Sequence, residues 1–551
     1  MGRFCHRGEE LKALPIYQQG LLLQLTQSVS VYDNQFFPGG VSNPVYPDFG
    51  DTQGYTGQLS EEHALIFAFH SLIDPDPNAR MSYAQRARNL LMYALQQAAL
   101  GHLAGAPFRD PLFAVYNRAN ASGQDWPLVV DWIYNASDAN GTPILTAQDK
   151  LTIRNVFVQW ANDCLNAYTT GGDHPAPIGV MNSPQLLPGN QAYRMAANNY
   201  YLGHARLLTM MGLSLDAGDD PPIDGSQPTT QLGNSLRSYL ADATGAWLYQ
   251  VFAMFADAPT VAAAYGLPGT PGLGLASGGL PPEGMLYGHS FAYLFDTLLA
   301  LQTAGYNDPS LSGPQIGLIG APVWDRFVRG FIASLVPAAQ VFASEPWLGP
   351  VYQMGSYGDL LRLYITPDFM QPFALLALLD QRTGIASRLN AERWFMINAT
   401  QGGAGNLLSR VLNPWNAVES IIYFLALDPN APPPTDPRPS MPLDFYDAPQ
   451  GRVLGHSDWS PTGSMFDFRC SWISINHQDG DAGQFELYRR GEWLTKEVSN
   501  YDSIGNGQTS AYHNALTAKN TCQHGTPANL GIAGNGSQVV IDDLTCGYTV
   551  Q

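Results

Sequence analysis

The sequence predicts an α+β protein, with a large helical part followed by a smaller β part. From about residue 57 to 424, apolar residues recur mainly at helical spacing, in segments separated by Pro- and Gly-rich loops. Residues 428–439 are proline-rich, and such a stretch cannot continue a helix and makes a semi-rigid spacer. Short alternating segments with Gly and Asn turns follow it and indicate strands. We therefore expect a helical domain over 1–427, a linker over 428–439 and a β domain over 440–551.

The composition is that of a globular protein with a sizeable core. Hydrophobic residues make up 45% of the 551 residues and charged residues only 13%. The formal net charge of −19 argues against a nucleic-acid partner, because a phosphate-binding face usually shows as a basic domain. No apolar run is long enough to span a bilayer, and residues 1–6 do not lead into a signal-peptide core.

Eight segments of the helical part have clear helical periodicity. Helices of this length joined by long loops favour hairpins closed into a ring or partial ring, with a helical bundle as the alternative. The predicted helices are Glu61–Leu72, Tyr83–Leu100, Ala147–Tyr168, Ala192–Met211, Ser235–Phe255, Gly284–Ala304, Trp324–Leu335 and Met370–Leu379.

Two adjacent amides, Asn198 and Asn199, lie on one of these predicted helices. Asn is a poor helix former because its side chain competes with the backbone for hydrogen bonds. One amide therefore either points into a cleft, where it can bind a substrate carboxylate, or makes an ordinary structural hydrogen bond. His204 follows Asn199 by five residues and so does not lie on the same face of the helix, which makes it a weaker candidate.

A loop rich in Gly and Pro, residues 280–293, carries Glu283 and Tyr287 into a predicted helix start. Such a loop can aim side chains at a cleft, and Glu283 can also favour the positive end of the helix. Tyr287 is a candidate proton donor or acceptor if neighbouring cations lower its pKa. The alternative for Tyr287 is a buried ring with a satisfied hydroxyl.

The β part begins with residues that suit a site at the ends of strands. An alternating segment over 465–475 predicts a half-buried strand, and a second strand is expected over 484–488, followed by a turn at Arg489-Arg490-Gly491. Between them, His477 and Asp479 are two residues apart on an extended chain and so point the same way. With Glu497 and His513 they could complete an oxygen and nitrogen site for zinc or a similar ion. The alternative for Asp479 is a turn-forming role.

Aromatic and basic side chains beside loops are further candidates for binding a sugar. Tyr357 is one of several aromatic residues in loops, where rings stack on sugars, although large cores also use them. Arg194 is one of the arginines that could line a cleft, and a local positive field can oppose the negative net charge.

Together, these segments resemble the heparinase II/III-like polysaccharide lyases, which include heparin, alginate and oligoalginate lyases. The order and spacing of the motifs carry the resemblance. They are Asn198-Asn199-Tyr200, Glu283-Gly284 with Tyr287, Gly358-Asp359, His456-Ser457-Asp458-Trp459, residues 477–486 with Gly491, and Tyr512-His513-Asn514.

The resemblance implies an N-terminal incomplete (α/α) toroid followed by a C-terminal antiparallel β-sandwich, with the active site between them. The β region is short for the sandwich of this family, so we expect a truncated or reduced form of it. The implied reaction is β-elimination at a uronic acid, which leaves a 4,5-unsaturated uronyl end. The implied partner is an acidic polysaccharide or oligosaccharide, the implied location is secreted or periplasmic, and the oligomeric state is not indicated.

The family's residue roles can be carried over onto matching positions. Asn199 would neutralise the substrate carboxylate, with Asn198 as the alternative, while Tyr287 would act as the acid/base and His477 as its partner. No cofactor is required for this chemistry. The candidate substrate-binding residues are Asn198, Glu283, His204, Tyr357 and Arg194, and the candidate ligands of a structural Zn or Ca ion are Asp479, Glu497 and His513, with Asp479 standing where some relatives have histidine.

Three other functions fit part of this pattern. A uronyl C5-epimerase would share the proton abstraction without expelling the leaving group. An (α/α)-toroid glycoside hydrolase would need two carboxylates across the scissile bond, and Glu283 is the one candidate. A non-catalytic glycan-binding protein would use the same cleft without turnover.

Overall fold

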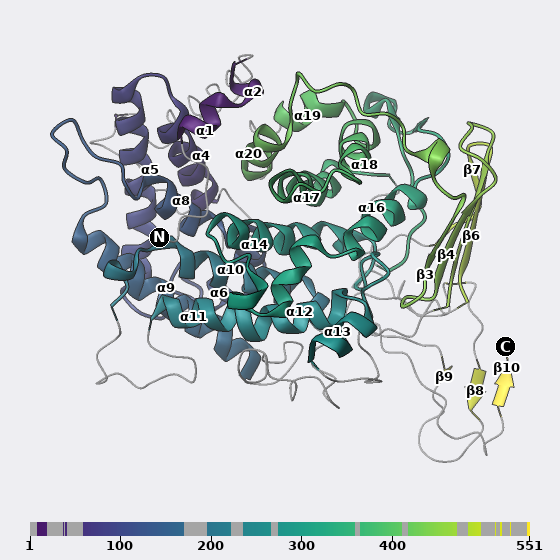
Figure 1. Ribbon diagram of the computed structural model, residues 1–551, viewed down its shortest axis with the longest axis horizontal. Coiled ribbons are helices and arrows are strands. Elements are labelled where there is room, and N and C mark those ends of the chain that lie inside the picture. The colour runs from purple at the N-terminus through teal and green to yellow at the C-terminus, as the bar shows by residue number, and fades with distance from the viewer. Residues whose placement is uncertain are drawn as a thin grey trace.

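The protein is predominantly helical, with an antiparallel sheet on its C-terminal side, as the sequence predicts (Figure 1). This architecture is seen in a computed structural model. None of the described helices is long and apolar enough to cross a membrane. The structure describes residues 8–18, 37, 39–40, 59–169, 196–221, 235–265, 274–358, 364–409, 417–470, 483–497, 513, 518–520, 529–530 and 548–550.

Six helices contact one another in a closed cycle (Figure 1). Every one of them is mostly buried where its side chains are described, because each meets two neighbours of the cycle. In order around the cycle they are α4 (Ser60–Ile73), α8 (Asp125–Ile133), α10 (Asn199–Ser214), α14 (Phe291–Thr303), α17 (Met370–Thr383) and α20 (Ala417–Ala426), and α20 contacts α4.

Further helices pack against members of this cycle. They include α5 (Pro77–Ala98) on α4, α9 (Ala147–Thr169) and α11 (Leu236–Asp242) on α10, and α18 (Leu389–Trp394) on α17. Helix α12 (Leu248–Phe255) contacts α14 through the rings of Phe255 and Phe291, and α16 (Val323–Ser334) contacts α17 through the stacked rings of Phe327 and Phe373. Short helices complete the set: α1 (Gly8–Ala13), α2 (Pro15–Gln18), α6 (Leu112–Val115), α7 (Asn117–Ser122), α13 (Ala258–Tyr265), α15 (Pro309–Ser312) and α19 (Gly403–Ser409).

All eight predicted segments contain a helix, but two helices of the cycle, α8 and α20, were not predicted. Helix α8 has only nine residues with Pro127 in its first turn, so its helical period is short and interrupted. The start of α10 also differs from the prediction. The described helix begins at Asn199, whereas residues 192–195 of the predicted segment lie outside the described residues.

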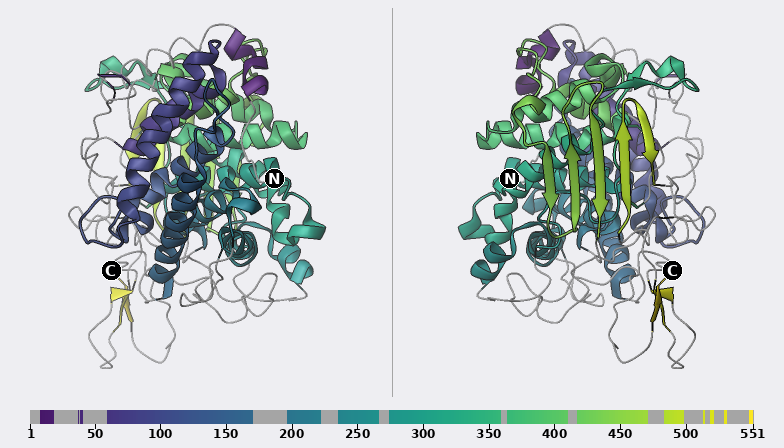
Figure 2. Two further views of the ribbon diagram at one scale, coloured as in Figure 1. Left: turned by 90° about the vertical axis from the view of Figure 1, so that its left-hand side faces the viewer. Right: turned by 90° about the vertical axis from the view of Figure 1, so that its right-hand side faces the viewer.

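The C-terminal side holds a five-stranded antiparallel sheet in the order β3-β4-β5-β6-β7. Figure 2 shows these strands as one layer beside the helices. Arg490 and Gly491 have φ values of 51° and 93°, so the predicted turn between β6 and β7 uses left-handed backbone. The strands are β3 (Asp444–Asp447), β4 (Arg452–His456), β5 (Ser464–Arg469), β6 (Phe485–Arg489) and β7 (Glu492–Thr495), and smaller sheets pair β1 (Gln340–Val341) with β2 (Pro350–Val351) and β8 (Ala518–Asn520) with β9 (Asn529–Leu530) and β10 (Tyr548–Val550).

The predicted period of two is present in β5, but the polar side chains are the buried ones. Asp467 and Arg469 are 3% and 2% exposed, whereas Phe466 and Phe468 are 43% and 40% exposed. The buried face meets polar loops of the helical part, which explains why it carries charges. Residues 471–475 of the predicted strand lie outside the described residues.

Paired charges occupy this buried sheet face. Arg452 on β4 binds Asp467 on β5 through Nε, at 2.9 Å from Oδ1, and through Nη2. The ring of Tyr357 lies against both arginines, with the guanidinium carbons of Arg452 and Arg469 at 4.1 Å and 4.8 Å from the ring centroid. Tyr357 belongs to a loop of the helical part, so these contacts hold that loop against the sheet.

Carboxyl groups are also buried inside the helical cycle. Glu61 forms a bidentate pair with Arg118, at 2.7 Å and 2.8 Å. Glu62 and Asp125 lie near this pair and are 5% and 0% exposed. Burial, with the negative charge of neighbouring carboxylates, raises the pKa of both Glu62 and Asp125.

We expect Arg452→Met to lower the free energy of unfolding by about 3–5 kcal/mol, because it leaves the Asp467 carboxylate buried and unpaired. Lys150→Met is the control, since Lys150 pairs with Asp219 at 2.8 Å on a partly exposed surface and should cost about 1 kcal/mol or less. Denaturant unfolding followed by tryptophan fluorescence measures both, and equal losses would contradict the role of the buried pair.

We expect Asp125→Asn to stabilise the protein increasingly as the pH rises. An aspartate in the unfolded chain ionises near pH 4, whereas buried Asp125 resists ionisation, so the wild type loses stability above about pH 4 relative to the variant. Asp308→Asn is the control of opposite sign. Hydrogen bonds from Ser310 lower the pKa of exposed Asp308, so this variant should lose stability at neutral pH and match the wild type in acid. Melting temperatures at about pH 2.5, below both the unfolded and the lowered pKa, and at about pH 7.5 test both signs.

Candidate functional site

The amide pair forms the start of α10. Asn198 is the N-cap residue in extended conformation, and its side-chain oxygen accepts a hydrogen bond from the backbone N–H of Tyr200 at 2.9 Å. The side-chain oxygen of Asn199 accepts from the same N–H at 2.8 Å. Asn suits this position because its side chain satisfies a backbone donor that has no partner within the helix. The two amides that weaken a helix interior therefore mark a helix start.

The carboxylate of Glu283 bridges both asparagines. Its Oε1 accepts from the side-chain Nδ2 of Asn198, and its Oε2 accepts from the backbone N–H of Asn199 at 2.8 Å. Glu283 is 1% exposed, and its charge lies at the positive end of α10, which favours a carboxylate. Gly284 has φ of 111°, which suits glycine and lets the chain turn directly after Glu283.

The sheet holds the loop before Glu283. The backbone N–H of Leu280 donates to Asp447 Oδ2 at 3.1 Å, and its carbonyl accepts from Gln450 Nε2 at 2.9 Å. Burial raises the pKa of Asp447 to about 6, while hydrogen bonds from the backbone N–H groups of Gln450 and Leu280 and the charge of Arg452 oppose the rise. The loop thus connects the sheet to the N-terminus of α10.

Tyr357 fixes the same loop from the other side. Its hydroxyl donates to the carbonyl of Pro281 at 2.5 Å, and its carbonyl accepts from the N–H of Met285 at 2.9 Å. Its side chain is 1% exposed. The contact of Tyr357 with substrate stays a prediction, and in this structure its phenol ring links the loop to the two sheet arginines.

Tyr287 follows in a short 3-10 helix, η5 (Leu286–Ser290), which packs against α10, α14 and α17. Tyr287 and Asn199 are 5% and 6% exposed, so a substrate can touch them only if covering side chains move. Asn198, Asn199, Glu283 and the segment with Tyr287 are therefore brought together.

His289 is a neighbour of Tyr287 that the sequence reasoning did not single out. Its ring centroid lies 5.8 Å from that of Tyr287 and 6.1 Å from that of Tyr293. Nδ1 is 2.6 Å from the carbonyl of Leu286, to which it can only donate, so Nε2 is the basic nitrogen. Burial lowers the pKa of His289 and favours the neutral imidazole. The Tyr-x-His spacing was the available signal.

His204, a predicted substrate contact, lies inside the helical part. Its side chain is buried, and Nε2 is 2.8 Å from the carbonyl of Val115. Arg194, the other predicted contact not yet placed, lies outside the described residues, as does the predicted catalytic His477.

Two of the three predicted metal ligands are neighbours. His513 Nδ1 lies 3.8 Å from Glu497 Oε1, and both side chains are buried. Asp479, the third, lies outside the described residues. Within the described part of the chain, no three His, Cys, Asp or Glu side chains are arranged to hold a metal ion. The structural Zn or Ca site stays a prediction.

The chain is similar to solved structures of heparinase III and heparan sulfate lyase, whereas no family model and no curated protein matches its sequence. A heparinase III, the BT4657 gene product, is 10% identical with a TM-score of 0.43, over 91% of this chain and 63% of that one. The heparan sulfate lyase HepC from Pedobacter heparinus is 12% identical with a TM-score of 0.40, over 94% and 73%. The chain thus matches less than two thirds of the length of the first enzyme. Because these identities and TM-scores are low, the assignment of the candidate site rests on the contacts within this structure that are described above.

Proposed function

We propose that this protein is a polysaccharide lyase that cleaves a uronic-acid-containing glycan by β-elimination. The observation that supports it most is the Glu283 carboxylate, which joins the Asn198–Asn199 amides to the loop leading to Tyr287. An amide donor and a phenol are the groups that this reaction needs beside the uronate. They come from segments more than eighty residues apart, which only tertiary contacts can join.

Two features of the fold support this proposal. We take the closed cycle of six helices as the inner ring of an incomplete (α/α) toroid. We take the five-stranded sheet as one layer of a β-sandwich, because its outer face exposes Phe466, Phe468, Phe485 and Leu487. The domain division at 428–439 stays part of this proposal.

The reaction assigns one task to each side chain. The Asn199 amide donates to the uronate carboxylate and stabilises the negative charge that develops when the C5 proton leaves. Tyr287 takes that proton or returns one to the glycosidic oxygen. The C5–H and C4–O bonds break, a C4=C5 double bond forms, and the leaving oxygen gains a proton. His477 is the proposed partner from the β part, and His289 is a described imidazole beside Tyr287.

The geometry favours elimination over glycoside hydrolysis. A hydrolase needs two carboxylates that face the scissile bond, one of them able to donate a proton. Both oxygens of Glu283 instead accept hydrogen bonds from Asn198 and Asn199. Glu283 is thereby assigned to positioning the amides, and its predicted direct contact with substrate is the alternative.

We expect the protein to release products with the ultraviolet absorbance of an unsaturated uronyl end from at least one of alginate, heparan sulfate, hyaluronan or glucuronan. Asn199→Ala and Tyr287→Phe should each lower kcat/KM by about a hundredfold or more, because each removes a group that acts on the transition state.

Glu492→Gln, an exposed change on β7, is the matched control and should keep full activity. Chain cleavage without the absorbance would point to a hydrolase, and solvent deuterium in uncleaved glycan would point to an epimerase. Binding without any turnover, unaffected by Tyr287→Phe, would leave a glycan-binding protein.

We expect Glu283→Gln to lower kcat/KM by about ten- to a hundredfold while the fold persists. In the variant, one oxygen of residue 283 becomes an amide nitrogen, which cannot accept a hydrogen bond from the N–H group of Asn198 or Asn199 that it faces. A hydrogen bond to a charged group is worth about 1.5–3 kcal/mol, so its loss would displace the amide pair. Glu283→Asp, which keeps the charge but shortens the side chain, should recover part of the activity if positioning is the role. Full activity of Glu283→Gln, measured by the same absorbance, would contradict it.

A further inference from the structure

His289 presents an unused basic nitrogen beside Tyr287. It lies in η5, two residues after Tyr287, and its side chain is partly exposed, whereas Tyr287 is buried. The Nδ1 of His289 donates to the carbonyl of Leu286 at 2.6 Å, which fixes the tautomer that has its lone pair on Nε2. Within the described residues, Nε2 makes no hydrogen bond, and it is not among the fully buried ring nitrogens. Nε2 is therefore available to a ligand.

Two tyrosine rings flank this imidazole and hold it in place. The ring centroid of His289 lies 5.8 Å from that of Tyr287, with 34° between the ring planes, and 6.1 Å from that of Tyr293, with 84° between the planes. The backbone of η5 is also held, because Ser290 Oγ donates to the carbonyl of Tyr287 at 2.6 Å and η5 packs against α10, α14 and α17. The imidazole and the phenol of Tyr287 are thus side by side on a fixed segment, near enough to contact one sugar residue.

The surroundings keep this imidazole neutral at neutral pH. Burial lowers the pKa of His289 from its ordinary value of 6.5, while its backbone hydrogen bond and the negative charge of Asp368 oppose the fall. Asp368 lies in η8 (Pro367–Phe369), which contacts η5. On α10, the guanidinium carbon of Arg206 lies 4.2 Å from the ring centroid of Tyr293, on the other neighbour of the imidazole. His289 is therefore a free base where the reaction needs one.

An imidazole and a phenol suit opposite halves of an elimination. A phenol has an ordinary pKa of about 10, so at neutral pH it keeps its proton and is better suited to give one than to take one. A neutral imidazole has no proton on one nitrogen and is suited to take one. This difference separates the two tasks that the lyase proposal leaves open for Tyr287.

We propose that His289 is the general base of the elimination and Tyr287 its general acid, an inference that rests on the proposed lyase activity. Nε2 of His289 takes the C5 proton, and the electrons of the C5–H bond form the C4=C5 double bond. The C4–O bond breaks with its electrons going to oxygen, which takes the phenol proton of Tyr287. The imidazolium then gives its proton to the phenolate, directly or through water, and both side chains are restored.

His289→Phe tests the base, because phenylalanine keeps an aromatic ring between the two tyrosines but has no basic nitrogen. On alginate, heparan sulfate, hyaluronan or glucuronan, whichever the wild type cleaves, this variant should lower kcat/KM by about a hundredfold or more. His102→Gln is the control. His102 is 49% exposed and lies 3.1 Å from Asp163, so this variant should keep full activity.

The same variant separates His289 from His477, the partner proposed from the β part, which lies outside the described residues. If His477 is the base instead, His289→Phe keeps full activity, and that result would overturn the proposal.

Two further readouts distinguish a base from a ring that only packs. In the wild type, kcat/KM should fall in acid as His289 gains a proton, with a midpoint below pH 6.5, and His289→Phe should lack this fall. Added imidazole should raise the activity of His289→Ala severalfold, because it supplies the missing base, but should not raise that of Tyr287→Phe. The acid limb of the rescued reaction should follow the pKa of the added imidazole.

An acid limb that persists in His289→Phe, or a folded His289→Ala that imidazole does not rescue, would assign the ring to packing and overturn the proposal. A wild type that releases no unsaturated product from any of the four glycans would overturn the lyase proposal and this inference with it. An active wild type beside an equally active His289→Phe overturns this inference alone.

Discussion

The buried carboxylate of Glu283 is the contact on which the candidate site depends. It holds the N-terminus of α10 through Asn198 and Asn199, so the position of the amide pair follows the position of one loop. A carboxylate is stable there because a helix N-terminus supplies unpaired N–H donors and partial positive charge. Without it, two donors at the start of α10 would lose their buried acceptor.

That loop in turn depends on the sheet. Asp447 and Gln450 bind the backbone of Leu280, and Tyr357 ties Pro281 to Arg452 and Arg469 on the inner sheet face. The sheet therefore has two different faces. Its inner face uses buried charges to hold loops of the helical part, and its outer face exposes phenylalanines. Burying charges in this way requires close pairing, and the Arg452–Asp467 pair meets that requirement.

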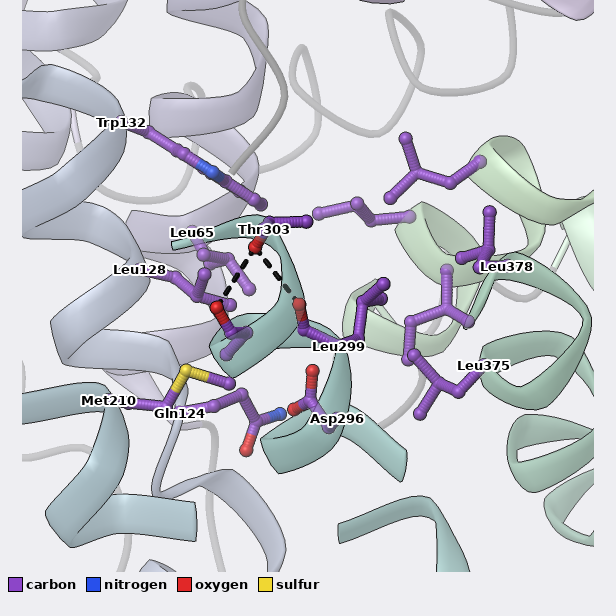
Figure 3. Close-up of a pocket in the computed structure, with 14 residues that line it drawn as sticks. Leu65, Gln124, Leu128, Trp132, Met210, Asp296, Leu299, Thr303, Leu375 and Leu378 are labelled. Carbon is purple, nitrogen blue, oxygen red and sulfur yellow. Dashed lines mark hydrogen bonds between the residues drawn. The ribbon is translucent and has the colours of Figure 1, made fainter. Parts of the chain in front are cut away.

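The helices of the cycle carry polar side chains near their starts and apolar side chains farther along. Glu61, Glu62, Asp125 and the asparagine pair lie near the starts of α4, α8 and α10, whereas leucines and isoleucines farther along these and the other cycle helices line a mostly apolar pocket on the axis of the cycle (Figure 3). Arg206 lies between the two regions, with its guanidinium carbon 4.2 Å from the centroid of Tyr293 and its Nη1 near Asp296. Polar groups gather where helix starts leave donors unsatisfied, and apolar groups fill the part where the backbone is paired.

The sequence by itself determined the helical and β parts, eight helical segments and the turn at Arg490–Gly491, because periodicity and turn chemistry are local. It also singled out Asn198, Asn199, Glu283 and Tyr287, because unfavourable amides and a Gly-Pro loop stand out in a helical pattern. Tertiary structure alone decided that Glu283 meets the asparagines and that the polar face of β5 is buried. Short α8 and the neighbouring His289 were also missed. These features depend on which surfaces meet, and residues far apart in the sequence carry no local signal of the contacts between them.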